Sequence, residues 1–160
     1  MDASKYLAKI KLNPKFIDFS KEELELFISY CKVEEYNKGE TIVSEGSKGD
    51  KFYIIIEGQV GVSKSITEEV VFFLTTLNEG EFFGEMAILT NHPRSANVFA
   101  KTDVVLISFD SIAYDTLKRE NKIIYSKLNS IFAMTLAERL YKVEERIKLI
   151  LKASLIKDII

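Results

Sequence analysis

The sequence predicts a mainly β chain with helices at both ends. The expected fold is an antiparallel, jelly-roll-like β-roll of about eight strands, with an N-terminal helical segment and a long C-terminal helix. Two observations carry this prediction. All seven glycines lie between residues 39 and 84, among short runs rich in β-branched and aromatic residues. From Ser111 onward there is neither Gly nor Pro, and apolar residues recur at helical spacing. A chain of 160 residues suits one domain with an extension.

A short helix is expected at residues 21–31. Ser20 followed three residues later by Glu23 is a capping box, and Leu24, Phe27 and Ile28 continue the helical spacing. Cys31 is the single cysteine of the chain, so no intrachain disulfide can form. We interpret Cys31 as a small buried apolar residue and expect a reducing, cytoplasmic location, since residues 1–8 lack the features of a secretory signal.

The middle of the chain is expected to form the strands. Gly58 lies in a tight connection between two of them, and the segment 46–49 forms another turn, in positions where glycine permits a positive φ. The six strand ranges that the sequence marks are 41–43, 52–56, 60–65, 70–77, 96–100 and 104–109.

A long amphipathic helix follows from Ser111 to the end of the chain. Its apolar residues alternate in spacings of four and three, which is the pattern of a coiled-coil seam. We divide the chain into a domain of residues 1–130 and a helical segment of residues 131–160, and expect that segment to form a homodimer interface or a lid. The residues of this heptad stripe are Leu136, Leu140, Val143, Ile147 and Ile150.

Composition excludes several classes of function. A net charge of -2 gives no positive field for nucleic acid, and no apolar run approaches the ~18 residues of a membrane span. With one histidine and one cysteine the chain cannot supply a metal centre or a nucleophilic triad, so we expect no metal, no cofactor and no catalysis. His92, beside Pro93, is interpreted as a solvated loop residue.

Residues 80–96 contain most of the residues that suggest a ligand-binding site. Gly84 followed by Glu85 indicates a sharp turn that opens a short helix, whose first N–H groups favour an anion. A guanidinium at Arg94 can grip two oxygens of a phosphate, with the Ser95 hydroxyl beside it and close backbone approach at Ala96. A carboxylate at Glu85 next to a phosphate needs a donor, and a ribose hydroxyl supplies one. Together these residues predict a nucleotide site.

The same segment resembles the phosphate-binding cassette of the cyclic-nucleotide-binding domain family, as in catabolite activator protein and protein kinase A regulatory subunits. The resemblance covers residues 14–130 and includes Gly39-Glu40, Glu45-Gly46, Gly49-Asp50, Gly58-Gln59 and Gly80-Glu81 upstream. The cassette itself is Phe83-Gly84-Glu85-Met86-Ala87-Ile88 followed by Arg94-Ser95-Ala96.

The resemblance implies a role for each cassette residue toward cAMP or cGMP. Glu85 accepts the ribose 2′-OH, Arg94 pairs with the cyclic phosphate, and Ser95 donates to it. Gly84 lets the ribose approach. The serine at position 95 favours cAMP over cGMP but does not determine the choice of base. The remaining implied contacts are the backbone amides of Ala87 and Ala96 and a wall formed by Val62, Thr75 and Met86.

The resemblance also bears on the final helix. In the catabolite-activator branch this helix pairs two subunits and places a polar pair beside adenine, but Val143 and Glu144 stand at those positions here. We expect no DNA-binding element in this chain, and a base contact from an apolar residue or from Arg139. The expected function is a non-catalytic cyclic-nucleotide sensor. The alternatives are a β-roll that serves assembly without nucleotide, or a fragment of a larger transcription factor or channel.

Overall fold

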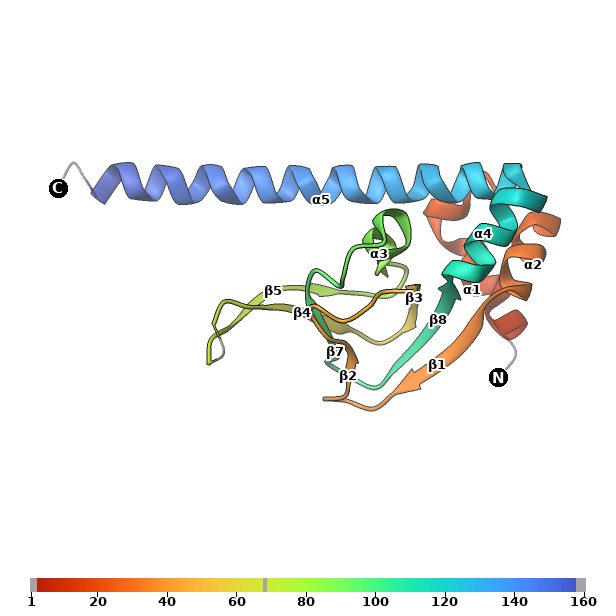
Figure 1. Ribbon diagram of the computed structural model, residues 1–160, viewed down its shortest axis with the longest axis horizontal. Coiled ribbons are helices and arrows are strands. Elements are labelled where there is room, and N and C mark those ends of the chain that lie inside the picture. Colours follow the sequence, from red (N-terminus) through yellow and green to blue (C-terminus); the bar gives the residue numbers. More distant parts are fainter. Residues whose placement is uncertain (1–2, 68, 158–160) are drawn as a thin grey trace.

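The computed structural model describes residues 3–67 and 69–157 of the chain. The N-terminal helices and α4 lie together at one end of a β-roll, and α5 runs along one side of it (Figure 1). The helical elements are η1 (Ala3–Tyr6), α1 (Leu7–Leu12), η2 (Pro14–Phe16), α2 (Lys21–Ser29), α3 (Glu85–Thr90), α4 (Ser111–Glu120) and α5 (Lys122–Lys157). The strands are β1 (Lys32–Tyr36), β2 (Thr41–Val43), β3 (Lys51–Glu57), β4 (Val60–Ser65), β5 (Val71–Leu77), β6 (Phe82–Phe83), β7 (Asn97–Ala100) and β8 (Val104–Asp110).

The expected antiparallel β-roll is confirmed. In the described residues the strands form two four-stranded antiparallel sheets, in the orders β1-β8-β3-β6 and β2-β7-β4-β5. The glycines expected to need a positive φ do so at Gly46 and Gly58, with φ of 78° and 84°. Gly49 does not: it is required for space, because a Cβ built there would lie 2.2 Å from the Cβ of Ala87.

Strand β3 separates two apolar cores because its side chains alternate between the two faces of the sheet. Phe52 and Ile54 pack with the helices, in a cluster that also contains Phe27 from α2 and Phe132 from α5. Tyr53 and Ile55 point to the other face and pack between the two sheets. The site described below lies at the rim of this second core.

The N-terminal helix begins as expected and ends two residues early. Ser20 and Glu23 form both hydrogen bonds of the capping box, and α2 ends at Ser29. Cys31 is buried and its thiol donates to the carbonyl of Phe27, while burial raises the pKa of that thiol. It is therefore a core residue.

The single helix predicted from Ser111 onward is instead two helices, α4 and α5. After a break at Asn121, α5 runs for 36 residues, along one side of the molecule and past the roll (Figure 1). Ile131, Phe132 and Thr135 are buried, so the packed part of α5 extends beyond residue 130. Among the described residues, no helix is long and apolar enough to cross a membrane.

Candidate functional site

Gly84 sets the geometry of the site at the start of α3. Its φ is 88°, in the left-handed region that glycine tolerates best. A Cβ at this position would lie 2.6 Å from Nη1 of Arg94 and 2.7 Å from the carbonyl oxygen of Lys51. Glycine therefore permits both the turn into α3 and the close approach of the Arg94 side chain.

Arg94 is fixed at its backbone by the turn that precedes β3. Its N–H donates to the carbonyl of Ser47, and its own carbonyl accepts from the N–H of Gly46, each at 2.8 Å. The turn and the return segment after α3, which are about fifty residues apart in the sequence, are therefore locked together. This locking holds the Arg94 side chain at one end of a pocket.

The guanidinium of Arg94 is buried without a carboxylate partner. The residue is 7% exposed, and in the described part of the chain no carboxylate lies within ion-pair distance of it. Nη1 donates to the carbonyl of Gly84 at 3.2 Å, and the guanidinium lies 5.8 Å from the centroid of the Tyr53 ring. Burial lowers the pKa of Arg94 from its ordinary value. Such a group is well placed to bind an anion, since a buried charge is costly until it is paired.

Glu85, the first residue of α3, is 1% exposed. Its Oε1 accepts from Nη1 of Arg139 at 2.5 Å. Its Oε2 is buried and has no hydrogen-bond partner among the described residues. A buried acceptor without a donor is unfavourable by about 1–3 kcal/mol, so this oxygen is suited to a ligand that brings a hydroxyl or amino group.

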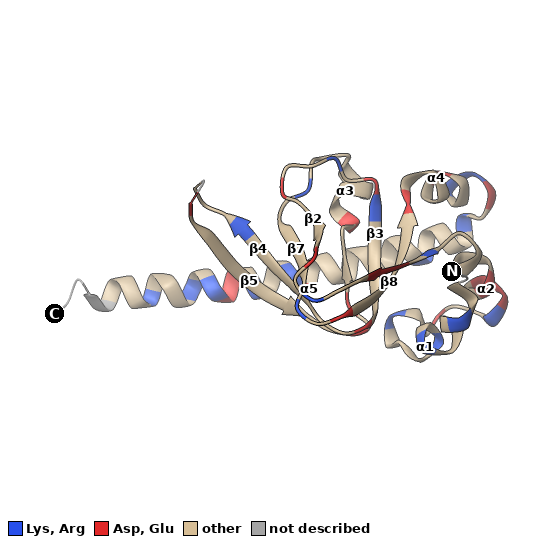
Figure 2. Ribbon diagram, turned by 90° about the horizontal axis from the view of Figure 1, so that it is seen from below, with Lys and Arg blue, Asp and Glu red and all other residues tan. Residues whose placement is uncertain are grey.

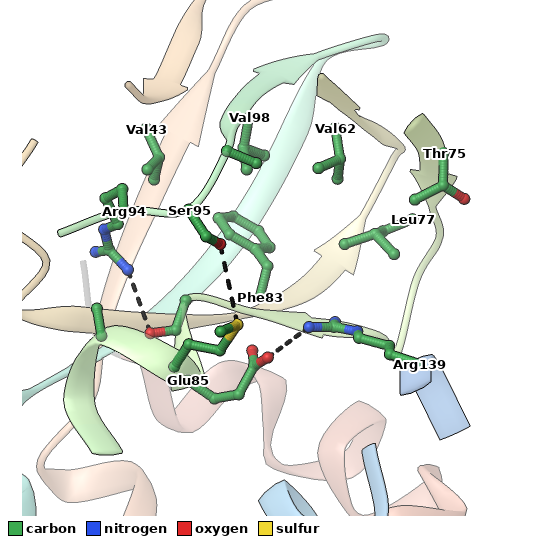
Figure 3. Close-up of a pocket in the computed structure, with 14 residues that line it drawn as sticks. Val43, Val62, Thr75, Leu77, Phe83, Glu85, Arg94, Ser95, Val98 and Arg139 are labelled. Carbon is green, nitrogen blue, oxygen red and sulfur yellow. Dashed lines mark hydrogen bonds and ion pairs between the residues drawn. The ribbon is translucent and has the colours of Figure 1, made fainter. Parts of the chain in front are cut away.

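Arg139 reaches the site from α5. Besides its ion pair with Glu85, its Nη2 donates to the carbonyl of Phe82. Arg139 enters the pocket from the side opposite Arg94 (Figure 3). The sequence indicated Arg139 only as a base contact; its pairing with Glu85 joins residues 54 positions apart, for which no local pattern exists.

These side chains surround one pocket (Figure 3). Arg94 and Ser95 lie toward one end and Arg139 at the other (Figure 3), and aliphatic side chains from β2, β4, β5 and β7 form the wall. The hydroxyl of Ser95 lies 3.9 Å from the sulfur of Met86. The lining residues are Val43, Val62, Thr75, Leu77, Phe83, Gly84, Glu85, Met86, Ala87, Arg94, Ser95, Ala96, Val98 and Arg139.

Of the nine cassette residues, all except Ile88 line this pocket, together with the expected wall residues Val62 and Thr75; Ile88 belongs to the core beside the helices. Sequence reasoning did not identify Val43, Leu77 and Val98 as lining residues, because an apolar strand residue gives the same signal whether it faces a core or a cavity. The described residues contain no group of His, Cys, Asp and Glu side chains that could hold a metal ion.

The amino-acid sequence matches the family model "Cyclic nucleotide-binding domain" over residues 33–121. The cAMP-dependent protein kinase regulatory subunit of Mycosarcoma maydis is 39% identical over 89 residues, which are 54% of this chain and 16% of that protein. Human cGMP-dependent protein kinase 2 is 36% identical over 91 residues, which are 56% of this chain and 12% of that protein. The chain therefore spans less than a fifth of the length of these relatives.

Similar folds are found among solved structures. A cyclic nucleotide-binding domain from Methylobacillus flagellatus superposes with a TM-score of 0.83 at 25% identity, over 91% of this chain and 84% of that one. The superposition includes nearly the whole chain, so it extends the agreement beyond the residues that the family model matches.

Proposed function

Because the chain belongs to the cyclic nucleotide-binding domain family, we propose that its pocket binds cAMP, and cGMP equally or less tightly. Domains of this family regulate other activities and are not themselves catalytic. The observation that carries the proposal is that one pocket contains two groups which, among the described residues, lack a partner of the opposite kind: the guanidinium of Arg94 has no carboxylate, and Oε2 of Glu85 has no donor.

A cyclic nucleotide satisfies both groups at once. Its phosphate carries one negative charge and two free oxygens, which suit the guanidinium of Arg94 and the hydroxyl of Ser95. Its ribose 2′-OH is a donor for Glu85. The backbone amides of Ala87 and Ala96 are assigned to the phosphate oxygens, and Gly84 and Met86 to the sugar and base.

We assign the purine base of the nucleotide to the apolar wall of the pocket. Val62 and Thr75 line the pocket on the strands, and Arg139 closes it from α5. The aliphatic side chains pack on the faces of a purine but form no hydrogen bonds with the polar atoms at its edge. We therefore expect only a modest difference in affinity between adenine and guanine nucleotides.

Titration calorimetry with cAMP, cGMP and ATP tests the proposal. We expect saturable binding of cAMP to one site per chain, and much weaker binding of ATP, because its triphosphate does not fit a clamp for one cyclic phosphate. Absence of binding by both cyclic nucleotides at millimolar concentration would favour the assembly module, which needs no nucleotide.

We further propose a homodimer through α5. Leu140, Val143, Ile147 and Ile150 of the heptad stripe are exposed, with 60% exposure at Leu140 and 50% at Ile147. Because these residues recur at coiled-coil spacing and the roll leaves them uncovered, a second copy of the same helix is the matching occupant. The proposed division into a nucleotide-binding unit of residues 1–130 and a helical segment of residues 131–160 follows this use of α5.

The chain is proposed to be a regulatory module without catalytic activity, cofactor or metal, located in the cytoplasm. Support comes from the single buried thiol of Cys31, which agrees with a reducing compartment, and from a pocket whose described lining has hydroxyls but no histidine or cysteine beside them.

A further inference from the structure

Beneath Arg94 lies an aromatic pair to which the proposed binding mode gives no role. Tyr53, on β3, is 5% exposed, and its ring stacks on Phe83 of β6 with centroids 4.8 Å apart and an angle of 17° between planes. The guanidinium carbon of Arg94 lies 5.8 Å from the centroid of Tyr53. The ring pair is held by the sheet itself, because Tyr53 and Phe83 are register partners of β3 and β6.

We propose that Tyr53 is a positioning residue for the phosphate contact: its ring, fixed on Phe83, holds the guanidinium of Arg94 in the orientation that meets the cyclic phosphate. This inference rests on the proposed function, since it deepens the role given to Arg94. Tyr53 itself does not line the pocket, so it acts through Arg94 and not on the nucleotide.

An aromatic ring suits this task better than a carboxylate. The negative face of the ring attracts a cation and compensates part of the cost of burying it, but leaves the positive charge available. A carboxylate at the same place would pair with Arg94 and compete with the phosphate. Burial raises the pKa of the Tyr53 hydroxyl, so the ring stays a neutral phenol at physiological pH.

The backbone of Gly49 also confines the side chain of Arg94. A Cβ built on Gly49 would lie 2.9 Å from Nε of Arg94 and 2.2 Å from the Cβ of Ala87. The side chain of Arg94 therefore has little free space beside the backbone of Gly49, and its Nη1 donates a hydrogen bond to the carbonyl of Gly84. A ring removed from this arrangement leaves space into which the guanidinium can turn.

The test compares the affinities for cAMP and for adenosine, which keeps the base and ribose but lacks the cyclic phosphate. In Tyr53→Leu we expect cAMP to bind about tenfold more weakly, with adenosine unchanged. Tyr53→Phe keeps the ring and should stay within about twofold of the wild type for both ligands. Tyr114→Leu is the matched control, because it removes another buried tyrosine ring, 5.0 Å from Tyr125 and remote from the pocket.

A double-mutant cycle with Arg94→Ala separates positioning from general packing. If Tyr53 acts through Arg94, Tyr53→Leu should cause no further loss of cAMP affinity once Arg94 is alanine. An equal loss in both backgrounds, an equal loss for adenosine, or unchanged cAMP affinity in Tyr53→Leu would each overturn the inference while leaving the proposed function intact. A wild-type protein that binds no cyclic nucleotide would overturn both.

A measurement on the wild type keeps the inference testable if Tyr53→Leu does not fold. The NMR resonances of the Arg94 side chain should show a ring-current shift that persists in Tyr53→Phe. Random-coil shifts for the Arg94 side chain in the wild type would overturn the inference.

Discussion

Arg94 and Glu85 carry opposite charges in one pocket, yet they do not form an ion pair with each other in the described structure. Glu85 pairs with Arg139 instead, and Arg94 is satisfied by a backbone carbonyl and an aromatic ring. This separation keeps the positive charge of Arg94 free for an anion. It also makes the two residues separately testable.

Arg94→Ala should lower cAMP affinity at least about thirtyfold, because it removes the charge-assisted contacts to the phosphate. The fold should remain intact, since among the described residues the side chain is held by one hydrogen bond, to the carbonyl of Gly84. Calorimetry and a thermal melt measure both effects. Arg119→Ala, at an exposed position near the end of α4, is the control for loss of one positive charge. Equal affinities of Arg94→Ala and wild type would show that the phosphate lies elsewhere.

Glu85 should determine the preference for a ribose. The wild type is expected to bind 2′-deoxy-cAMP about tenfold more weakly than cAMP, because Oε2 of Glu85 stays without a donor. In Glu85→Ala the two ligands should bind equally. Glu85→Gln should retain part of the discrimination, since its amide oxygen still accepts. Undiminished discrimination in Glu85→Ala would assign the 2′-OH to another residue.

At the scale of elements, α5 is connected to the pocket through the ion pair of Arg139 with Glu85. A nucleotide that donates its ribose hydroxyl to Oε2 of Glu85 shares this carboxylate with Arg139, which donates to Oε1. Ligand binding and the docking of α5 are therefore coupled, because a ligand shifts an equilibrium through its differential contacts with the two states. Farther along α5, Arg146 donates to the carbonyl of Leu74 on β5.

Arg139→Ala should loosen α5 in the absence of nucleotide. We expect faster amide hydrogen exchange over residues 136–150, and a smaller change on addition of cAMP than in the wild type. Lys142→Ala, at an exposed position one turn away on the same helix, is the matched control and should leave exchange unchanged. If saturating cAMP did not change the amide exchange rates of α5 in the wild type, α5 would have no part in the response to ligand.

The sequence was sufficient for the elements with strong local signals. The capping box at Ser20 and the glycines of the tight turns predicted where α2 and the hairpins begin, because these residues have few alternative uses. Strands β1 and β6 were not among the predicted ranges. β6 contains only Phe82 and Phe83, which is too short for a periodic pattern, and β1 carries the charged residues of Lys32–Tyr36.

The half-buried Glu34 in β1 shows why the strand gave no signal. Its carboxylate accepts from Lys51 at 2.9 Å and from the hydroxyl of Tyr36 at 2.8 Å. Such partners become visible only after the strands are paired. The same limit applies to Arg139 and Glu85, whereas the cassette residues are adjacent in sequence and could be predicted together.

At the scale of the whole molecule, the exposed heptad stripe decides the oligomeric state. Ile147→Glu should convert a dimer to a monomer, because it places a charge at the centre of the proposed coiled-coil interface. Leu149→Glu is the matched control, since Leu149 is also exposed but lies on another side of α5. Light scattering coupled to gel filtration distinguishes the outcomes. A monomeric wild type would refute the dimer.

Nucleotide binding should also stabilise the whole domain. At ligand concentrations about 100 times the dissociation constant, the free energy of unfolding should rise by about 2.7 kcal/mol. For a chain of this size the melting temperature then rises by roughly 5–10 °C. Thermal melts with increasing cAMP measure the shift, and Arg94→Ala should reduce it at equal concentration. A melting temperature independent of cAMP would contradict a site in the folded state.

Because α5 is one continuous helix, a small rotation about its contact with the pocket moves its far end by a larger distance. From Arg139 to Lys157 the helix extends about 27 Å at 1.5 Å per residue, and Figure 2 shows this arm projecting beyond the roll. A tilt of about 10° at Arg139 therefore displaces the far end by about 5 Å. A small tilt of α5 where it contacts Glu85 thus becomes a movement at the tip comparable to the rise of a full helical turn.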